Sequence, residues 1–407
     1  WSLKNIPAME SEKLQPDLSG IFPVLVFSSL NRYQPLVDFF TGQKAFNYET
    51  TPQMDGFLNH LVSENPTTMK QVFAVQESVV REINLFAIPE DIVGYQLRSP
   101  AEVWNSNGGT VAEKTILMTT LLKKLGFSAE PVLIFQGQGF DQSIGNLSDL
   151  EEWAVKTEIP ETGTVYLSVK QVNAFDLRLL DLQNVFMILE NDNQFKLVYP
   201  EPEKTVLALK EVYVIDPELT FSGELSGALT GTANPYLALV RSDEKLKYYL
   251  RGGIPSSKLE EINTEELTAG KTSFKCNLNN VSVLKKDSNM FTLALTYFSM
   301  GIGSWDIGQL PAQRQTPVEI PSGYRESYNL TLAFPENLKF RSAEQEIRIK
   351  NNVGSFLFLV QKKENTLQVR KEIEISKKII GTEDYPDFKE LMDTWSIWQT
   401  NNVLFTR

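Results

Sequence analysis

Cysteine and histidine are almost absent from this sequence, which has one of each in 407 residues, Cys276 and His60. A cysteine nucleophile needs a base within hydrogen-bond reach to form its thiolate. Cys276 lies in a strand-like stretch without a helix start, where we expect a small, buried hydrophobic residue. His60 falls off the apolar face of an apparent short helix, where we expect a solvated surface histidine. Chemistry of the Cys-His-Asp type is therefore excluded for this chain.

Long apolar runs, long runs of like charge and cysteine pairs are missing as well. No stretch has the roughly 18 consecutive apolar residues of a transmembrane helix, so no transmembrane segment is predicted. The formal net charge of −12 argues against nucleic acid or an anionic membrane as the main partner. A single histidine cannot form a histidine-based metal site, and no Walker loop is present. We therefore predict no metal and no cofactor.

Changes of pattern along the chain predict an α+β region followed by an all-β region. Residues 1–30 read as an extended lead-in that contains the strand-like segment FPVLVFSSL. Residues 31–204 show helical periodicity first and strand patterns later. The rest of the chain reads as all-β, and the Gly- and Pro-rich region 300–325 is a candidate boundary within it. We predict a β domain at 205–315 and, at 316–407, either a second β domain or the second half of one β-sandwich, with a short terminal helix.

A buried helix is predicted from about Val111 to Leu125. Its apolar residues recur at intervals of three and four, and Gly126 is a suitable residue to end it. Thr110 and Glu113 have the spacing of a capping box, in which each side chain binds the backbone amide of the other residue. Such a cap engages the Thr110 hydroxyl and keeps it from acting as a nucleophile.

Two strand patterns on either side of residues 190–193 predict a β-hairpin. We place the centre of its turn between Asn191 and Asp192. Asn184 and Tyr199 are equally distant from that centre, so they should face each other across the hairpin. A catalytic triad requires such a facing pair of positions for its histidine and for the aspartate that orients the histidine.

Residues 99–134, SPAEVWNSNGGTVAEKTILMTTLLKKLGFSAEPVLI, resemble the core of the transglutaminase-like superfamily, which is related to papain-like cysteine peptidases. The resemblance extends more weakly over 31–204. It implies an α+β fold in which a transglutaminase-like, cysteine-proteinase-type core is followed by one or more antiparallel β-sandwich domains. The matching residues are Arg98, Pro100, Glu102, Val103, Gly109, Glu113, Lys114, the helix through Leu125-Gly126 and the strand at 131–134.

The resemblance also locates the catalytic triad of the family in this sequence. The cysteine position is Val111, the histidine position is Asn184 and the aspartate position is Tyr199. Valine carries no nucleophile, and an asparagine amide cannot act as a base near neutral pH. Lys114 lies on another side of the helix from Val111, and we expect it to be a surface or salt-bridging lysine. The triad is therefore predicted to be lost.

The flanking segments resemble a group of secreted Bacteroidetes proteins, which carry β domains before and after a transglutaminase-like core. The similar segments are WSLKNIPAMESEKLQP at the start and GELSGALTGTANPYLALVRSDEKL further on. This resemblance implies a periplasmic or cell-surface location in a Gram-negative bacterium. It also implies that residues 1–30, beginning at Trp1, end a missing N-terminal β domain.

Three functions follow from these observations. The leading hypothesis is a catalytically inactive binding or scaffolding module for peptide, glycan or protein, and its cleft is either open to a ligand or filled by its own side chains. The second is an active protease or transglutaminase with non-standard residues, and the third is a structural or adhesive envelope protein. The sequence identifies no ligand and no oligomeric state. The predicted ligand-binding residues are Trp104, Asn107, Val111, Asn184 and Tyr199.

Overall fold

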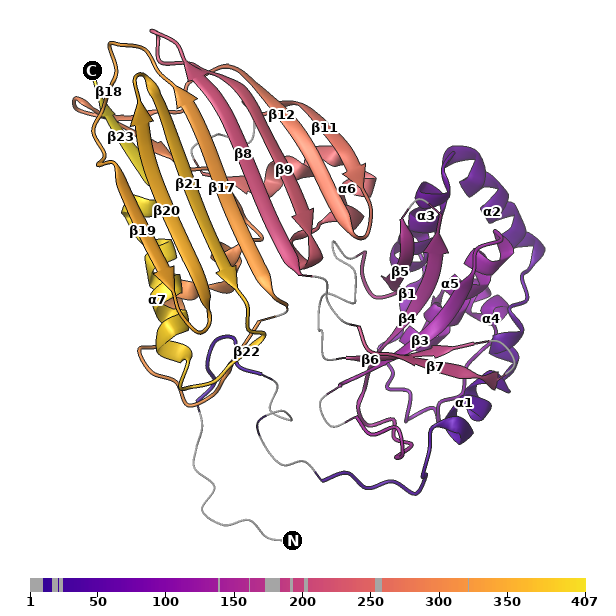
Figure 1. Ribbon diagram of the computed structural model, residues 1–407. Coiled ribbons are helices and arrows are strands. Elements are labelled where there is room, and N and C mark those ends of the chain that lie inside the picture. The colour runs from indigo at the N-terminus through magenta and orange to yellow at the C-terminus, as the bar shows by residue number, and fades with distance from the viewer. Residues whose placement is uncertain are drawn as a thin grey trace.

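The chain forms an α/β lobe up to residue 200 and a β-rich lobe from residue 204 onward (Figure 1). No helix among the described residues is long and apolar enough to cross a membrane. The computed structural model describes residues 10–16, 21, 25–137, 140–160, 162–172, 184–190, 193–200, 204–252, 258–320 and 322–407.

The α/β lobe packs helices against a five-stranded antiparallel sheet of order β5-β4-β3-β6-β7. Its strands are β3 (Ala129–Phe135), β4 (Leu150–Ile159), β5 (Gly163–Ser168), β6 (Val185–Leu189) and β7 (Phe195–Val198). A short parallel ladder joins β1 (Asn84–Leu85) to β2 (Gly108–Gly109). The helices are α1 (Gln34–Thr41), α2 (Pro52–Glu64), α3 (Thr68–Arg81), α4 (Pro100–Asn105) and α5 (Val111–Lys124).

Helix α5 is the buried centre of this lobe. Every residue from Ala112 to Leu122 is buried, because α3 and α4 lie on one side of the helix and β3 and β4 on the other. The helix starts at Val111, and Gly126 follows its end with φ +88°. The prediction of an exposed or salt-bridging Lys114 is wrong, because α5 is covered on all sides. The Nζ atom of Lys114 instead donates a 2.7 Å hydrogen bond to the carbonyl of Ile83.

The two faces of the five-stranded sheet belong to different apolar clusters, because side chains alternate along each strand. The inner cluster, on the side of α1 and α5, contains Tyr33, Val37, Phe40, Ala112, Leu133, Phe135, Trp153, Met187 and Leu189. The outer cluster, on the opposite face, contains Val132, Ile134, Ala154, Tyr166, Phe186 and Ile188. A third, helical cluster joins α2, α3 and α5 to β4 and β5 and includes Tyr236 and Leu237 of the β-rich lobe.

One mixed eight-stranded sheet dominates the β-rich lobe (Figure 1). Its order is β11-β12-β9-β8-β17-β21-β20-β19, and β8 and β17 run parallel. The expectation of a purely antiparallel sandwich is therefore wrong at this pair. Strands from both sides of the 300–325 region share the sheet. They are β8 (Thr205–Ile215), β9 (Phe221–Thr230), β11 (Glu260–Leu267), β12 (Lys271–Val281), β17 (Tyr324–Ala333), β19 (Gln345–Lys350), β20 (Gly354–Lys363) and β21 (Thr366–Ile375).

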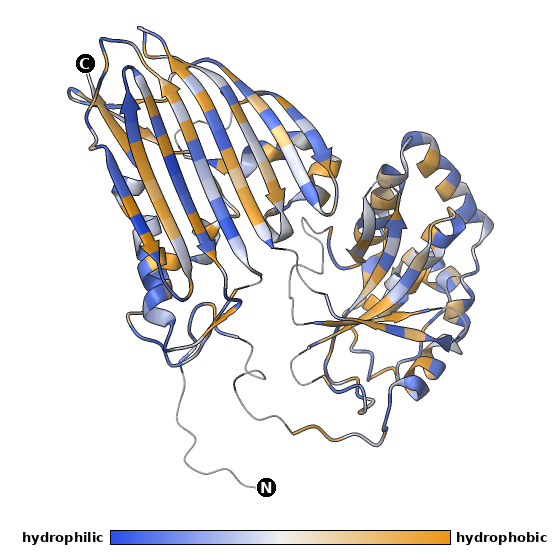
Figure 2. Ribbon diagram, in the orientation of Figure 1, coloured by the Kyte–Doolittle hydropathy of each residue, from blue (hydrophilic) through white to orange (hydrophobic). Residues whose placement is uncertain are grey.

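A second layer covers the inner face of the large sheet and completes one apolar core. It consists of a small sheet, β13 (Lys285–Asp287), β14 (Met290–Ala294), β18 (Lys339–Phe340) and β23 (Asn402–Thr406), together with α6 (Tyr236–Arg241) and α7 (Tyr385–Ser396). Figure 2 shows the alternation of hydrophobic and hydrophilic residues along the long strands that this arrangement requires. Two-residue ladders pair β10 (Leu250–Arg251) with β15 (Tyr297–Phe298) and β16 (Val318–Glu319) with β22 (Ile379–Ile380).

The described parts of the lead-in contact both lobes. The carboxylate of Glu12 accepts hydrogen bonds from the backbone amides of Gln315 (3.1 Å) and Thr316 (2.8 Å) in the β-rich lobe. Within residues 25–30 the expected strand is absent, and Leu30 forms only an isolated bridge to Gly145. Trp1 lies outside the described residues.

Candidate functional site

The residue matched to a nucleophile, Val111, is the first residue of α5. The Thr110 hydroxyl accepts a hydrogen bond from the Glu113 amide (3.3 Å), and the Glu113 carboxylate accepts one from the Thr110 amide (2.9 Å). The capping box is therefore present and engages the Thr110 hydroxyl. The Thr115 hydroxyl, one turn further along α5, donates to the Val111 carbonyl at 2.9 Å. Val111 itself is half-buried and packs against both the inner and the helical cluster.

An ion pair between Arg98 and Glu113 lies at the start of α5. The Glu113 carboxylate accepts hydrogen bonds from Arg98 Nε (2.8 Å), Arg98 Nη2 (2.8 Å) and the Arg98 amide (3.0 Å). Arg98 also donates to the carbonyl of Gly108 at 2.8 Å. Burial raises the pKa of Glu113, but the hydrogen bonds from Arg98 and Thr110 outweigh it, so the pKa lies below its ordinary value. The site thus has a rigid, fully paired carboxylate and no base that titrates near neutral pH at this position.

The hairpin of β6 and β7 has a different register from the predicted one. Phe186 pairs with Val198, so the turn is centred half a residue later than the sequence suggested. The Glu190 amide donates to the Gln194 carbonyl at 2.9 Å, and Asn193 has φ +58°. A left-handed residue just before the second strand is common in hairpin connections other than the two-residue turn. Composition alone did not distinguish this turn from a longer one with a different centre.

Continued by one residue beyond the last pair, Phe186 with Val198, this register places Val185, and not Asn184, opposite Tyr199. The predicted pairing of Asn184 with Tyr199 is therefore wrong by one residue, which reverses the face of the sheet. Alternation puts Val185 on the face of Met187, next to α5, and Asn184 on the face of Phe186. Asn184 is buried and donates to Glu151 at 3.3 Å, whereas Tyr199 is 57% exposed.

The five residues predicted to bind a ligand do not converge. Trp104 packs on Phe57, with 5.2 Å between ring centroids, and shares the helical cluster with Val111. Asn107 is exposed in a left-handed turn, where its carbonyl accepts from Asn84. The Asn107 amide donates a 3.1 Å hydrogen bond to the Trp104 carbonyl. Within the described residues, no hydrogen bond, ion pair or ring contact joins Asn184 or Tyr199 to the other three. Val111 is half-buried, packs against two apolar clusters and is not among the residues that line the two cavities described below.

Cys276 and His60 lie in different lobes. Cys276 is fully buried on β12, and burial raises the pKa of its thiol to about 12. The His60 side chain is 72% exposed on α2, 3.5 Å from Glu64. Both positions agree with the expected buried thiol and solvated histidine. Because they lie in different lobes, His60 cannot act as a base for the Cys276 thiol.

A cavity of about 620 Å³ opens on the α/β lobe. Residues 28–30, 89–91 and 145–148, together with Leu36, Tyr95 and Leu150, line it. Several of these residues pack against the inner cluster, as Val111 does, but Val111 does not line the cavity. This cavity was not predicted from the sequence, because its walls come from loops that are distant in the chain.

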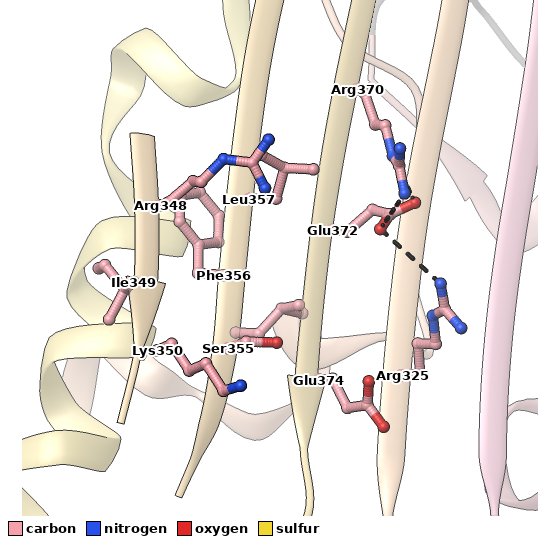
Figure 3. A pocket seen from close by; sticks show the side chains of 11 residues that line it. Arg325, Arg348, Ile349, Lys350, Ser355, Phe356, Leu357, Arg370, Glu372 and Glu374 are labelled. Carbon is pink, nitrogen blue, oxygen red and sulfur yellow. Dashed lines mark hydrogen bonds and ion pairs between the residues drawn. The ribbon is translucent and has the colours of Figure 1, made fainter. Parts of the chain in front are cut away.

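A second cavity, of about 320 Å³, lies on the solvent-facing side of β17, β19, β20 and β21 (Figure 3). Arg370 donates to both oxygens of Glu372 at 2.8 Å, and Arg325 lies 3.7 Å from the same carboxylate. Glu374 pairs with Lys204. The lining carries four cations, Arg325, Arg348, Lys350 and Arg370, and two carboxylates, Glu372 and Glu374, so its formal net charge is +2.

Buried charged residues in the β-rich lobe were also missed. Glu326 accepts hydrogen bonds from the Tyr324 hydroxyl (2.9 Å) and the Ile302 amide (2.7 Å). Glu211 accepts one from the Thr296 hydroxyl at 2.8 Å. Strand alternation points both side chains inward, but the sequence does not reveal partners that come from distant segments.

Comparison with known proteins shows two similarities. Residues 289–405 match a family described as a domain of unknown function with a solved structure, DUF3858. The fold is similar to that of a "putative protease" from Parabacteroides distasonis, with a TM-score of 0.60 and 18% sequence identity. That comparison covers 100% of this chain and 65% of the other, so this chain spans less than two thirds of its length. No curated protein matches.

Proposed function

We propose that this chain is a catalytically inactive transglutaminase-like protein of the bacterial cell envelope that acts as a binding or scaffolding module. Val111 at the capped start of α5 carries the proposal, because a thiol nucleophile would be most acidic at such a helix start. The similarity to a protease fold and the motif at 99–134 support the family assignment. The envelope location rests on the resemblance of the flanking segments to secreted proteins.

The neighbourhood of Val111 lacks the groups that acyl transfer needs. The Thr110 hydroxyl is engaged in the cap, and Glu113 is ion-paired to Arg98. The hairpin position that faces α5 is Val185, which has no ionisable group, and its neighbour across the hairpin is the exposed Tyr199. A helix start without a nucleophile or a base can still present a shaped surface, which supports binding over chemistry.

Turnover assays test this proposal. The purified chain is incubated with a mixed peptide substrate and, separately, with a glutamine peptide and a primary amine. We expect neither peptide cleavage nor amine incorporation above the buffer rate. Turnover that persists after Val111→Ala, Asn184→Ala and Tyr199→Phe would overturn the proposal and support an active enzyme with non-standard residues.

A structural or adhesive role is the second candidate. The packing of Val111 against two apolar clusters favours it, because a filled site has no space for a ligand at that position. This role predicts that the chain binds no soluble ligand but is retained on cell envelopes. Sedimentation together with isolated cell envelopes separates the two candidates. It is measured for the unaltered chain and for the chain with the α/β-lobe substitutions described in the next subsection.

A further inference from the structure

Two carboxylates without protein partners line the 620 Å³ cavity of the α/β lobe. Glu90 and Asp91 form no side-chain hydrogen bond or ion pair within the described residues. Among the described residues that line the cavity, these two are the charged ones. The site therefore has a net negative charge, and a cation could bind there without displacing an existing ion pair.

The wall that carries these carboxylates is held in a fixed conformation. Tyr95 lines the cavity at φ +57°, a left-handed conformation that is costly for a residue other than glycine. Its amide donates to the Glu90 carbonyl at 2.8 Å, and its carbonyl accepts from Gln43 Nε2 at 3.1 Å. Burial, and then the charges of Asp91 and Glu90, raise the pKa of Tyr95.

The opposite wall is fixed by contacts between the lead-in and the loop before β4. The Ser28 hydroxyl donates to the Gly145 carbonyl at 2.5 Å, and the Gly145 amide donates to the Leu30 carbonyl at 3.0 Å. A side chain at Gly145 would come within 2.3 Å of the Arg32 carbonyl, so glycine is required for this approach. Both walls are thus formed before any ligand binds.

Apolar side chains also line this cavity, and others are exposed next to its lining residues in the chain. Leu36, Leu147 and Leu150 line the cavity from the inner cluster. Phe27 and Ile92, which are adjacent in the chain to lining residues, are 78% and 74% exposed. Large exposed apolar residues beside a cavity are typical of an interaction surface.

We infer that this cavity binds a lysine or arginine side chain of a peptide segment that has apolar residues on either side of it. The aliphatic stem of such a side chain would pack on the leucines that line the cavity. Its charged end would reach Glu90, Asp91 and the Tyr95 hydroxyl. The apolar neighbours would cover Phe27 and Ile92. This inference rests on the proposed binding role, but it uses a surface that Val111 does not line.

The test uses three fluorescein-labelled heptapeptides of one sequence, with arginine, glutamine or glutamate between two leucines. Fluorescence anisotropy is measured with the full chain at low and high salt. The arginine peptide should bind about tenfold more tightly than the glutamate peptide, and added salt should reduce the difference. The double variant Glu90→Gln/Asp91→Asn should lose most of this preference, and Ile92→Ser should weaken all three peptides by about threefold.

A matched double variant, Glu64→Gln/Glu77→Gln, removes two exposed carboxylates from α2 and α3 of the same lobe and should bind like the unaltered chain. No binding by any peptide, or an arginine preference that survives in the Glu90/Asp91 variant, would overturn the inference. Either result leaves the proposed loss of catalysis standing, since turnover is measured separately. Turnover, in contrast, would overturn that proposal without changing the binding data.

Discussion

The ammonium group of Lys371 lies 4.0 Å from the centre of the Trp395 ring and donates a 2.8 Å hydrogen bond to the Trp395 carbonyl. It also donates to Asn401 Oδ1 at 2.5 Å. Lys371 is on β21 of the large sheet and Trp395 is on α7, so one buried side chain joins the helix to the sheet. The contact combines two hydrogen bonds with a cation–π interaction away from water.

Loss of this side chain should therefore destabilise the β-rich lobe. Lys371→Met keeps the volume but leaves Asn401 Oδ1 without its donor and removes the shortest of the three hydrogen bonds to the Trp395 carbonyl. We expect the free energy of unfolding to fall by about 2 kcal/mol. Urea denaturation followed by tryptophan fluorescence measures this loss. Lys363→Met, at an exposed position of β20, is the control and should change stability by less than about 0.5 kcal/mol.

Glu211 should make stability depend on pH. Burial raises the pKa of its carboxyl to about 7, whereas the unfolded chain has an ordinary value near 4.5. The folded state therefore keeps a proton that the unfolded state releases between these two pKa values. The stabilisation is fully present below pH 4.5 and is lost as the pH rises through about 7, with a total on the order of 3 kcal/mol.

Glu211→Gln removes this titration while keeping an oxygen to accept from Thr296. Denaturation at pH 5, 6, 7 and 8 should show that the unaltered chain loses more stability with rising pH than the variant does. Other groups titrate in both chains, so only the difference between the two curves is informative. Parallel curves would show that Glu211 does not gain its proton on folding.

The contrast between α5 and the β6–β7 hairpin shows what the sequence could predict. The start and end of α5 were predicted because the signals are local: Thr110 and Glu113 at one end, and Gly126 at the other. The hairpin was also predicted, but its register depended on one left-handed residue, Asn193, which composition does not specify. A half-residue error in the turn centre was enough to exchange Asn184 for Val185.

The burial of charged residues could not be predicted from the sequence, for a different reason. Lys114 was predicted to be a surface or salt-bridging lysine, yet it is buried and donates to the carbonyls of Val80, in the last turn of α3, and Ile83, which follows that helix. The burial of Glu211 and Lys371 likewise depends on hydrogen-bond partners that lie tens of residues away in the chain. To predict such burial, one must know which other segment packs over the helix or strand. The periodicity of the helix or strand itself does not carry that information. The 620 Å³ cavity was missed for the same reason, since loops far apart in the chain form its walls.

Glu12 should hold the lead-in on the β-rich lobe. Its carboxylate accepts from two backbone amides and from the Thr316 hydroxyl, and it lies 3.8 Å from the buried side chain of Arg314. Glu12→Ala leaves the two amides and the Thr316 hydroxyl without their acceptor and removes the negative charge beside the Arg314 guanidinium, which should cost about 2 kcal/mol. Hydrogen exchange at the amides of Gln315 and Thr316 should accelerate at least tenfold. Glu10→Ala, an exposed carboxylate two residues earlier, should leave both amides protected.

The register of the β6–β7 hairpin can be tested by installing a cysteine and a histidine. In Val111→Cys the new thiol stands at the start of α5, whereas Cys276 is fully buried and should not react in the folded chain. If Val185 faces α5, adding Val185→His brings an imidazole to the thiol, and adding Asn184→His does not. The thiolate would then be stabilised only in the first combination, and its pKa would fall below about 7.

The rate of alkylation by iodoacetamide between pH 5 and 9 reports this pKa directly. We expect the Val111→Cys/Val185→His chain to react at pH 6, and the Val111→Cys/Asn184→His chain to react only above about pH 8. Val185 is buried, so circular dichroism and the melting temperature must show that each variant is folded. A shift with histidine at 184 would restore the register predicted from the sequence. A shift with neither would mean that the hairpin does not face the start of α5, and that the loss of catalysis then rests on the scarcity of cysteine and histidine alone.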